Sequence, residues 1–251
     1  MVYFDAHTHL QNYASSGKLD GALEAAAAAG VETMLCNGTR VGDWEKVAEL
    51  AAKRKGIVPC FGLHPWLLKV AAPGWLEALE TILLRVPSCV GEIGLDGGKN
   101  ASPARQAIAF TAQLRLAKKL GRPACVHCVK AWGPMLEIIK AERPGIFMLH
   151  SYGGSPEMMP EFTALGAYFS FSGAIMDSKR EKLRAALKAV PADRVLFETE
   201  SPEADAPGWR AGPAGIADVV CAASAVIGRT PEELAELSLA NGKKFIKHIG
   251  G

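Results

Sequence analysis

The chain has 251 residues, of which 49% are apolar, so it is long enough to form one large core, and we expect a single domain over residues 1–251. The formal net charge is +2, far from the strongly basic charge of a domain that binds nucleic acid nonspecifically. This charge neither supports nor excludes a DNA substrate. No apolar run approaches the roughly 18–20 residues that cross a membrane, and no secretory signal is recognisable, so we expect a cytoplasmic protein without a membrane partner.

The cysteines are predicted to be reduced, buried and small apolar side chains rather than disulfide partners. The pair Cys125 and Cys128 has the spacing of a zinc knuckle, but no second such pair exists, so a structural zinc site is not expected. The six positions are Cys36, Cys60, Cys89, Cys125, Cys128 and Cys221.

Short apolar runs alternate with longer segments of helical character along the whole chain. Eight runs are predicted to be strands: 2–7, 31–36, 56–63, 89–93, 123–128, 145–150, 167–171 and 194–198. The segments between them are predicted to be helices: 19–29, 43–54, 73–85, 103–120, 130–142, 156–165 and 179–189. Two further helices, 215–228 and 231–247, follow the last strand, and Thr230 is the expected N-cap of the second.

This alternation predicts an α/β fold, a (β/α)8 TIM-type barrel with additional C-terminal helices. An open, doubly wound sheet is the alternative, and it would collect its ligands at one crevice. A barrel instead brings together residues from the carboxyl ends of many strands. Polar residues follow six of the predicted strands, which favours the barrel.

Five of the six histidines lie at these predicted strand ends, whereas His248 lies in the C-terminal tail and is expected on the surface. Four imidazoles and two carboxylates can form one metal site, or two sites that share a carboxylate. Glu92 is the natural bridge because one carboxylate offers two oxygens. The residues at the strand ends are His7, His9, His64, Glu92, Asp96, His127, His150, Glu198 and Glu200.

Taken together, these segments resemble the TatD family of metal-dependent deoxyribonucleases, within the amidohydrolase-like barrels. The matching residues span nearly the whole chain in the family's order. They are Phe4-Asp5-Ala6-His7-Thr8-His9-Leu10, Gly62-Leu63-His64-Pro65, Gly91-Glu92-Ile93-Gly94-Leu95-Asp96, the Gln106 to Ala117 helix, Val126-His127-Cys128, His150-Ser151-Tyr152-Gly153-Gly154, Phe171-Ser172-Gly173, Glu198-Thr199-Glu200-Ser201-Pro202, and Thr230 through Phe245.

The resemblance implies a barrel that uses two divalent metal ions, Mg, Mn or Zn, to hydrolyse phosphodiester bonds of DNA, as an exonuclease. Glu92 and Glu200 are the implied catalytic residues, with Glu200 as the base. The implied metal ligands are His7, His9, Glu92, His127, His150 and Glu200. His64 is implied to lie in an outer shell or to meet a substrate phosphate, and Asp96 to support Glu92.

The chain departs from the family pattern at three places. The family usually has Asp where this chain has Glu200, and a Tyr-Leu pair after Pro202 that is absent here. A basic residue often follows the family's histidine by two positions, whereas here Val129 precedes Lys130. The longer arm of Glu200 is still expected to reach the metal.

Substrate contacts are expected around the mouth of the barrel. Cations there would contact phosphates, and aromatic rings would stack on bases. The candidates are Lys99, Arg105 and Lys130 for phosphate, and Trp66, Trp132 and Tyr152 for bases.

Two alternative functions remain open. The same residues could polarise the carbonyl of a small-molecule ester, amide or lactone, as other amidohydrolase-type barrels do. A metal-binding homologue without turnover is the other alternative, for which Glu200 is the main argument. No protein partner is inferred.

Overall fold

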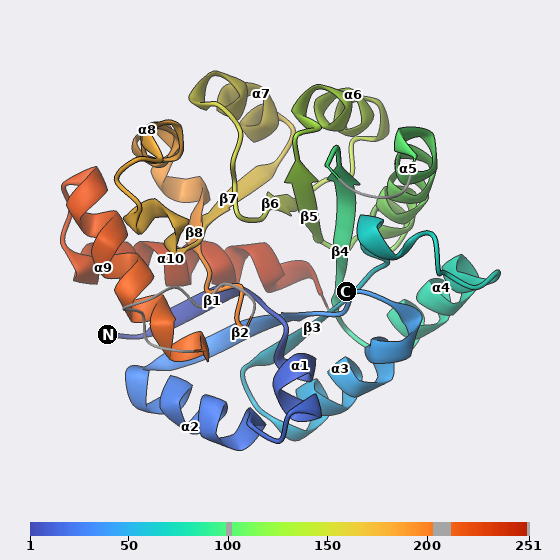
Figure 1. The fold of residues 1–251 in the computed structure, drawn as a ribbon, viewed down its shortest axis with the longest axis horizontal. Helices are drawn as coiled ribbons and strands as arrows, with labels where there is room; N and C mark the ends of the chain where they lie inside the picture. Colours follow the sequence, from blue (N-terminus) through green and yellow to red (C-terminus); the bar gives the residue numbers. More distant parts are fainter. Residues whose placement is uncertain (99–101, 203–211, 250–251) are drawn as a thin grey trace.

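The computed structural model describes residues 1–98, 102–202 and 212–249, and it contains an eight-stranded parallel sheet in the order β1 to β8. Each strand pairs with the next in the sequence, as in a (β/α)8 barrel (Figure 1). The barrel prediction is therefore confirmed, and the open sheet is excluded. The strands are β1 (Tyr3–Thr8), β2 (Val31–Asn37), β3 (Ile57–Phe61), β4 (Cys89–Asp96), β5 (Ala124–Val129), β6 (Phe147–Leu149), β7 (Ala167–Phe171) and β8 (Val195–Phe197).

Helices surround this sheet, and all of the predicted helical segments contain one. They are α1 (Leu10–Ser15), α2 (Leu19–Ala29), α3 (Val41–Lys53), α4 (Trp75–Arg85), α5 (Pro103–Lys119), α6 (Trp132–Glu142), α7 (Met159–Ala164), α8 (Glu181–Ala189), α9 (Ile216–Ile227) and α10 (Pro231–Phe245). Helix α1 was not predicted, because six residues are too few to show helical periodicity. Among the described residues, none of these helices has the length and apolar character needed to cross a membrane.

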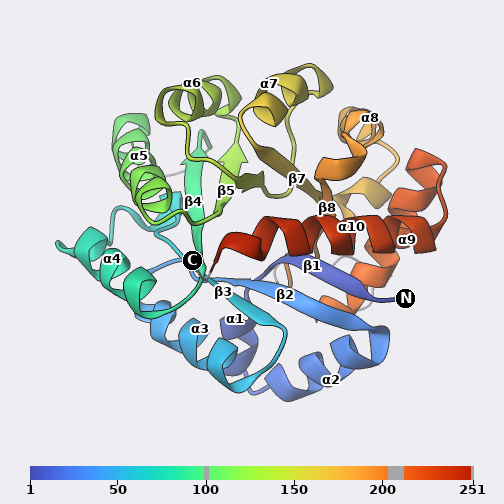
Figure 2. The ribbon, with the colours of Figure 1, turned by 180° about the vertical axis from the view of Figure 1, so that it is seen from behind.

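Helix α10 begins as its sequence predicts. The side chain of Thr230 accepts a hydrogen bond from the backbone N–H of Glu233, and the Glu233 carboxylate accepts one from the N–H of Thr230. This capping box satisfies two of the donors that a helix start leaves free. The helix then lies across β1 and β8, as Figure 2 shows.

The barrel is closed between β1 and β8 by bonds that join β1 and His9 to the residues just after β8. The N–H of Glu200 donates to the carbonyl of His7 at 2.9 Å, and the N–H of His9 donates to that of Ser201 at 2.8 Å. The buried carboxylate of Asp5 accepts from the hydroxyl of Thr199 at 2.6 Å and from its N–H at 3.0 Å. The two ends of the sheet are thus joined next to residues that the sequence predicts to bind metal.

The cysteines are free thiols, as predicted, and all but Cys221 are buried. Three of them, Cys60, Cys89 and Cys125, pack with Met148 and Leu196 in one apolar cluster. Small side chains suit this position because several strands converge on one narrow interior.

Close packing of α10 on β1 generates a testable prediction. A Cβ atom added to Gly242 would lie 2.5 Å from the ring of Phe4, which is shorter than any normal contact. Ala is ordinarily better than Gly inside a helix by about 1 kcal/mol, yet here the overlap costs about 1–3 kcal/mol. We expect Gly242→Ala to lower the free energy of unfolding, measured with urea.

The matched control is Gly21→Ala in α2, where an added Cβ has no heavy atom within 4 Å. That substitution should raise the stability by up to about 1 kcal/mol. Equal stabilisation by both substitutions would contradict the packing argument.

Candidate metal centre

Glu92 on β4 lies at the centre of the histidine cluster and is only 3% exposed. Its Oε2 atom faces the two histidines at the end of β1. The distance is 3.3 Å to Nε2 of His7 and 3.5 Å to Nε2 of His9. The two Nε2 atoms are themselves 3.2 Å apart. Three atoms that carry lone pairs therefore converge, which is the arrangement that a cation requires.

The other oxygen of Glu92 faces a second set of imidazoles. Its Oε1 atom lies 2.9 Å from Nδ1 of His127 and 2.9 Å from Nε2 of His150. The Nε2 atom of His64 is 3.1 Å away. Each oxygen of Glu92 thus belongs to its own group of nitrogens, as a bridging carboxylate would.

Hydrogen bonds fix which ring nitrogen is free on two of these histidines. The carbonyl of Asn37 accepts from Nδ1 of His9 at 2.8 Å, so the lone pair of His9 is on Nε2. Nε2 of His127 lies 3.4 Å from the carboxylate of Asp96, which leaves Nδ1 to face Glu92. Partners of this kind orient metal-ligating histidines. Asp96 therefore supports His127, which corrects the expectation that it supports Glu92.

His64 has the opposite arrangement. Its Nδ1 accepts from the N–H of Trp66 at 3.2 Å and caps the short helix η1 (Pro65–Leu67). A neutral ring whose Nδ1 accepts carries its proton on Nε2. His64 thus presents an N–H donor to the centre, which suits an outer position beside substrate oxygens better than metal ligation.

Glu198 directly follows β8; the sequence places it at a strand end, but it is absent from the expected metal ligands. It is fully buried, its carboxylate accepts from the hydroxyl of Ser170, and its Oε1 lies 3.5 Å from Nδ1 of His150. Nδ1 of His7 is also buried and has no hydrogen-bond partner among the described residues. His7, His150 and Glu198 form a third group of converging ligand atoms. Orphaned buried polar atoms of this chemistry fit a bound cation.

The protonation preferences agree with a centre that attracts cations. Burial alone would raise the pKa of Glu92, but the imidazoles of His64, His150 and His7 bring it well below its usual value. Burial lowers the pKa of His7 to about 4, so this ring is neutral and free to ligate. Burial disfavours charge on His150 as well, yet Glu92 and Glu198 raise its pKa well above the usual value.

Glu200 lies on the wall of a cavity of about 130 Å³ over the centre, together with His9, His64, Glu92 and His127. Burial raises its pKa to about 7, and the nearby carboxylates of Glu198 and Glu92 add to this effect. A carboxylate with such a pKa is suited to take up a proton near neutral pH.

Comparison with known proteins identifies the family of this chain. A family model described as TatD related DNase matches residues 4–247. The chain belongs to the TatD-related DNase family. Over 206 residues it is 35% identical to the 3'-5' ssDNA/RNA exonuclease TatD of Klebsiella pneumoniae, a match that covers 79% of this chain and 78% of that protein.

Two further matches concern YjjV of Escherichia coli K12. The chain is 28% identical over 216 residues to this protein, which is named an uncharacterized metal-dependent hydrolase, with 84% and 83% of the two chains covered. The crystal structure of YjjV, a TatD homologue, superposes with a TM-score of 0.90 at 27% identity over 97% of both chains. The present chain, as a member of the TatD-related family, is a metal-dependent hydrolase.

The described structure brings the six expected ligands of the TatD-family site to one place: His7, His9, Glu92, His127, His150 and Glu200. Which of them bind each ion remains a prediction. The signal that would have added Glu198 is its position as the first polar residue directly after β8.

The structure does not place all of the predicted substrate contacts at the cavity. Tyr152 is fully buried and its hydroxyl donates to the carbonyl of Ser155, so it cannot stack on a base, which corrects the prediction. Trp132 packs on Tyr152 with ring centroids 4.9 Å apart. Lys130 is exposed after β5 but does not line the cavity, whereas Trp66 does and is 45% exposed.

Two candidate phosphate contacts remain. Arg105 is exposed on α5. Lys99 lies outside the described residues.

Loss of one Glu92 oxygen should weaken metal binding more than any other single carboxylate change. In Glu92→Gln the amide NH₂ would face the imidazoles, and we expect metal affinity to fall by at least about 100-fold. The metal-to-protein ratio after dialysis, measured by elemental analysis, tests this. Glu49→Gln on the exposed face of α3 is the control and should keep its metal. Full metal retention by Glu92→Gln would refute the bridging role.

Proposed function

We propose that this chain is an exonuclease that hydrolyses phosphodiester bonds of single-stranded DNA with the help of two divalent ions, Mg, Mn or Zn. The observation that carries the proposal is the geometry of Glu92, whose two oxygens face two separate groups of imidazoles. A bridging carboxylate between two nitrogen-rich sites is the arrangement used for in-line displacement at phosphorus.

The ligands divide between the two ions. His7, His9, Glu200 and Oε2 of Glu92 would hold one ion, and Oε1 of Glu92 with His127 and His150 the other. Bound there, divalent ions lower the pKa of water and neutralise charge on a phosphate.

Glu200 would take the proton from the attacking water, since it lines the same cavity and its pKa of about 7 matches that task. The Nε2–H of His64 would donate to a phosphate oxygen.

The nucleic-acid substrate and the direction of attack rest on the relatives. Family members that match over most of the chain are named 3'-5' ssDNA/RNA exonucleases. The cavity of about 130 Å³ is consistent with this reading, because it has room for one phosphodiester group rather than a duplex. A strand end entering such a cavity would be shortened one nucleotide at a time.

The test is hydrolysis of end-labelled single-stranded DNA by purified protein with Mg²⁺, Mn²⁺ or EDTA. We expect stepwise shortening from the 3' end that EDTA abolishes. If the labelled DNA is not shortened with any of the metals, although metal stays bound to the protein, the proposal is refuted. Turnover of small esters, amides or lactones would then identify a small-molecule hydrolase, and no turnover at all a binding protein.

A second experiment tests the base. Glu200→Gln keeps the size of the side chain but removes its proton acceptor, so kcat should fall by about 10²–10⁴-fold. Glu200→Asp keeps a carboxylate that is one methylene shorter and should lose less, at most about 10²-fold. Equal losses in the two variants, with metal content unchanged, would show that Glu200 is not the base.

A further inference from the structure

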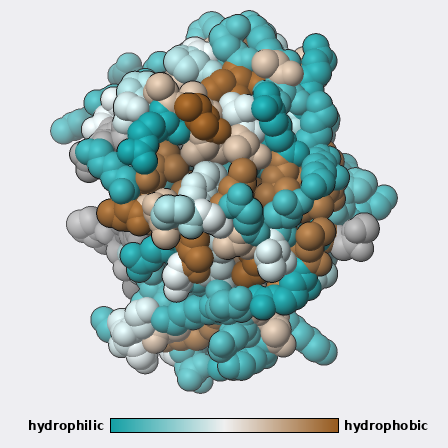
Figure 3. Space-filling view, turned by 90° about the vertical axis from the view of Figure 1, so that its right-hand side faces the viewer, coloured by the Kyte–Doolittle hydropathy of each residue, from teal (hydrophilic) through white to brown (hydrophobic). Residues whose placement is uncertain are grey.

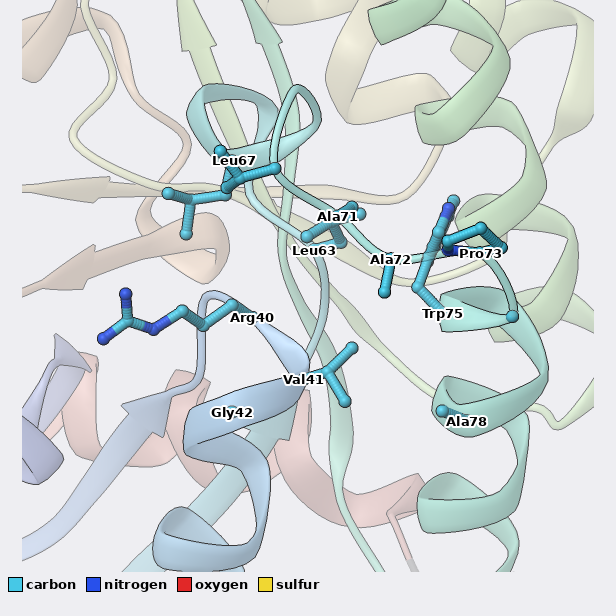
Figure 4. A pocket seen from close by; sticks show the side chains of 12 residues that line it. Arg40, Val41, Gly42, Leu63, Leu67, Ala71, Ala72, Pro73, Trp75 and Ala78 are labelled. Carbon is cyan, nitrogen blue, oxygen red and sulfur yellow. The ribbon is translucent and has the colours of Figure 1, made fainter.

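A second hollow adjoins the metal centre. It is a groove of about 270 Å³ between the start of α3, at residues 40–42, and the segment 63–78 that joins β3 to α4 (Figure 4). Leu67 lines both this groove and the cavity over Glu92, and Thr39 of that cavity precedes Arg40 of the groove. The groove therefore adjoins the cavity over Glu92.

The lining of the groove is almost entirely apolar. Small side chains such as Ala71, Ala72 and Ala78 leave the hollow open (Figure 4). Val70 is 79% exposed and Val41 is 42% exposed at its edge. Figure 3 shows hydrophobic residues gathered on this side of the molecule, with hydrophilic residues around them. Apolar surface left in contact with water beside an active site is typical of a ligand-binding groove.

The lining residues of the groove include one cationic side chain, that of Arg40. Arg40 is exposed at one end of the groove, and Pro73, Trp75 and Ala78 lie at the other end (Figure 4). Because Thr39 lines the metal cavity and directly precedes Arg40, the end with Arg40 is the one next to that cavity. From the centre outwards the order is metal ligands, then a guanidinium, then an apolar hollow.

We propose that this groove binds a nucleobase of the substrate strand, from a nucleotide next to the one whose phosphodiester is cleaved, while Arg40 contacts the phosphate between them. The inference rests on the proposed function. The order of chemistry along the groove repeats the order along a strand, in which an anionic phosphate alternates with a flat base whose two faces are apolar. Few side chains in the groove can read hydrogen-bonding edges, so it accepts every base.

The experiment measures binding rather than turnover. The probe is a fluorescent phosphorothioate oligodeoxythymidylate, which resists hydrolysis, added to the metal-loaded protein and followed by anisotropy. Val70→Asp places a carboxylate at the edge of the groove, on a side chain exposed enough to leave folding intact. We expect its Kd to rise about tenfold or more. Leu84→Asp is the control, since Leu84 is also exposed but lies outside the groove, and its Kd should be unchanged.

Arg40→Ala supplies a readout that a change in packing would not produce. Removing one phosphate contact should weaken binding and reduce the dependence of log Kd on log salt concentration by about one unit of slope. Arg54→Ala is its control, because Arg54 pairs with Asp20 away from the groove. An unchanged salt slope in Arg40→Ala would remove Arg40 from the substrate path.

The two proposals fail in different ways. Oligonucleotide binding that depends on Val70 and Arg40, without hydrolysis of a normal strand, would refute the nuclease but keep the groove. Hydrolysis with equal oligonucleotide binding by the wild type and by Val70→Asp and Arg40→Ala would overturn the groove proposal and keep the nuclease.

Discussion

The buried carboxylate of Glu92 is the constraint on which the rest of the site depends. A carboxylate that is 3% exposed has lost its water, and such a charge costs several kcal/mol unless partners compensate. Five imidazoles surround it, but they cannot all be protonated, because burial holds the pKa of His7 near 4 while that of His150 is raised. The neutral rings supply lone pairs, and the carboxylate supplies negative charge. A divalent cation satisfies both at once, so charge compensation and ligand supply are met by the same event.

The same reasoning ties metal binding to closure of the barrel. Ligands come from β1 at one end of the sheet and from the residues after β8 at the other. Asp5 and Thr199 join these two ends directly beneath the centre. A metal ion that binds only when both ends are in place stabilises the closed barrel by mass action. The short strands β6 and β8 are tolerable because backbone hydrogen bonds beyond their ends continue the pairing, and α10 packs against β8.

Sequence reasoning succeeded where one geometric rule was enough. Parallel strands in a barrel all end at one face, so His7, His127 and His150 had to meet once the strands were located. It failed where the chain changes direction. Tyr152 follows His150 by two residues, but Ser151 between them has a φ of 43°, and the chain turns the ring into the core.

The supporting residues were also beyond simple patterns. Whether Asp96 bonds to Glu92 or to His127 depends on the directions of side chains on β4 and β5. The order of residues in the sequence does not determine these directions. The role of His64 depends on a single backbone N–H from Trp66, which decides where its proton lies. The positions of ligands follow from topology, whereas their tautomers follow from local hydrogen bonds.

The near-neutral charge of the chain agrees with a nuclease that binds its strand through metal ions and base contacts as well as through cationic side chains. Proteins that hold nucleic acid by many phosphate contacts need a strongly basic face and lose affinity steeply with salt. With a net charge of +2, this chain has no such excess. The metal ions would instead meet one phosphate, Arg40 a second, and the apolar groove a base. Stacking and burial depend little on salt, so the enzyme would select for an exposed single-stranded end, whose bases are free to leave the stack, rather than for charge alone.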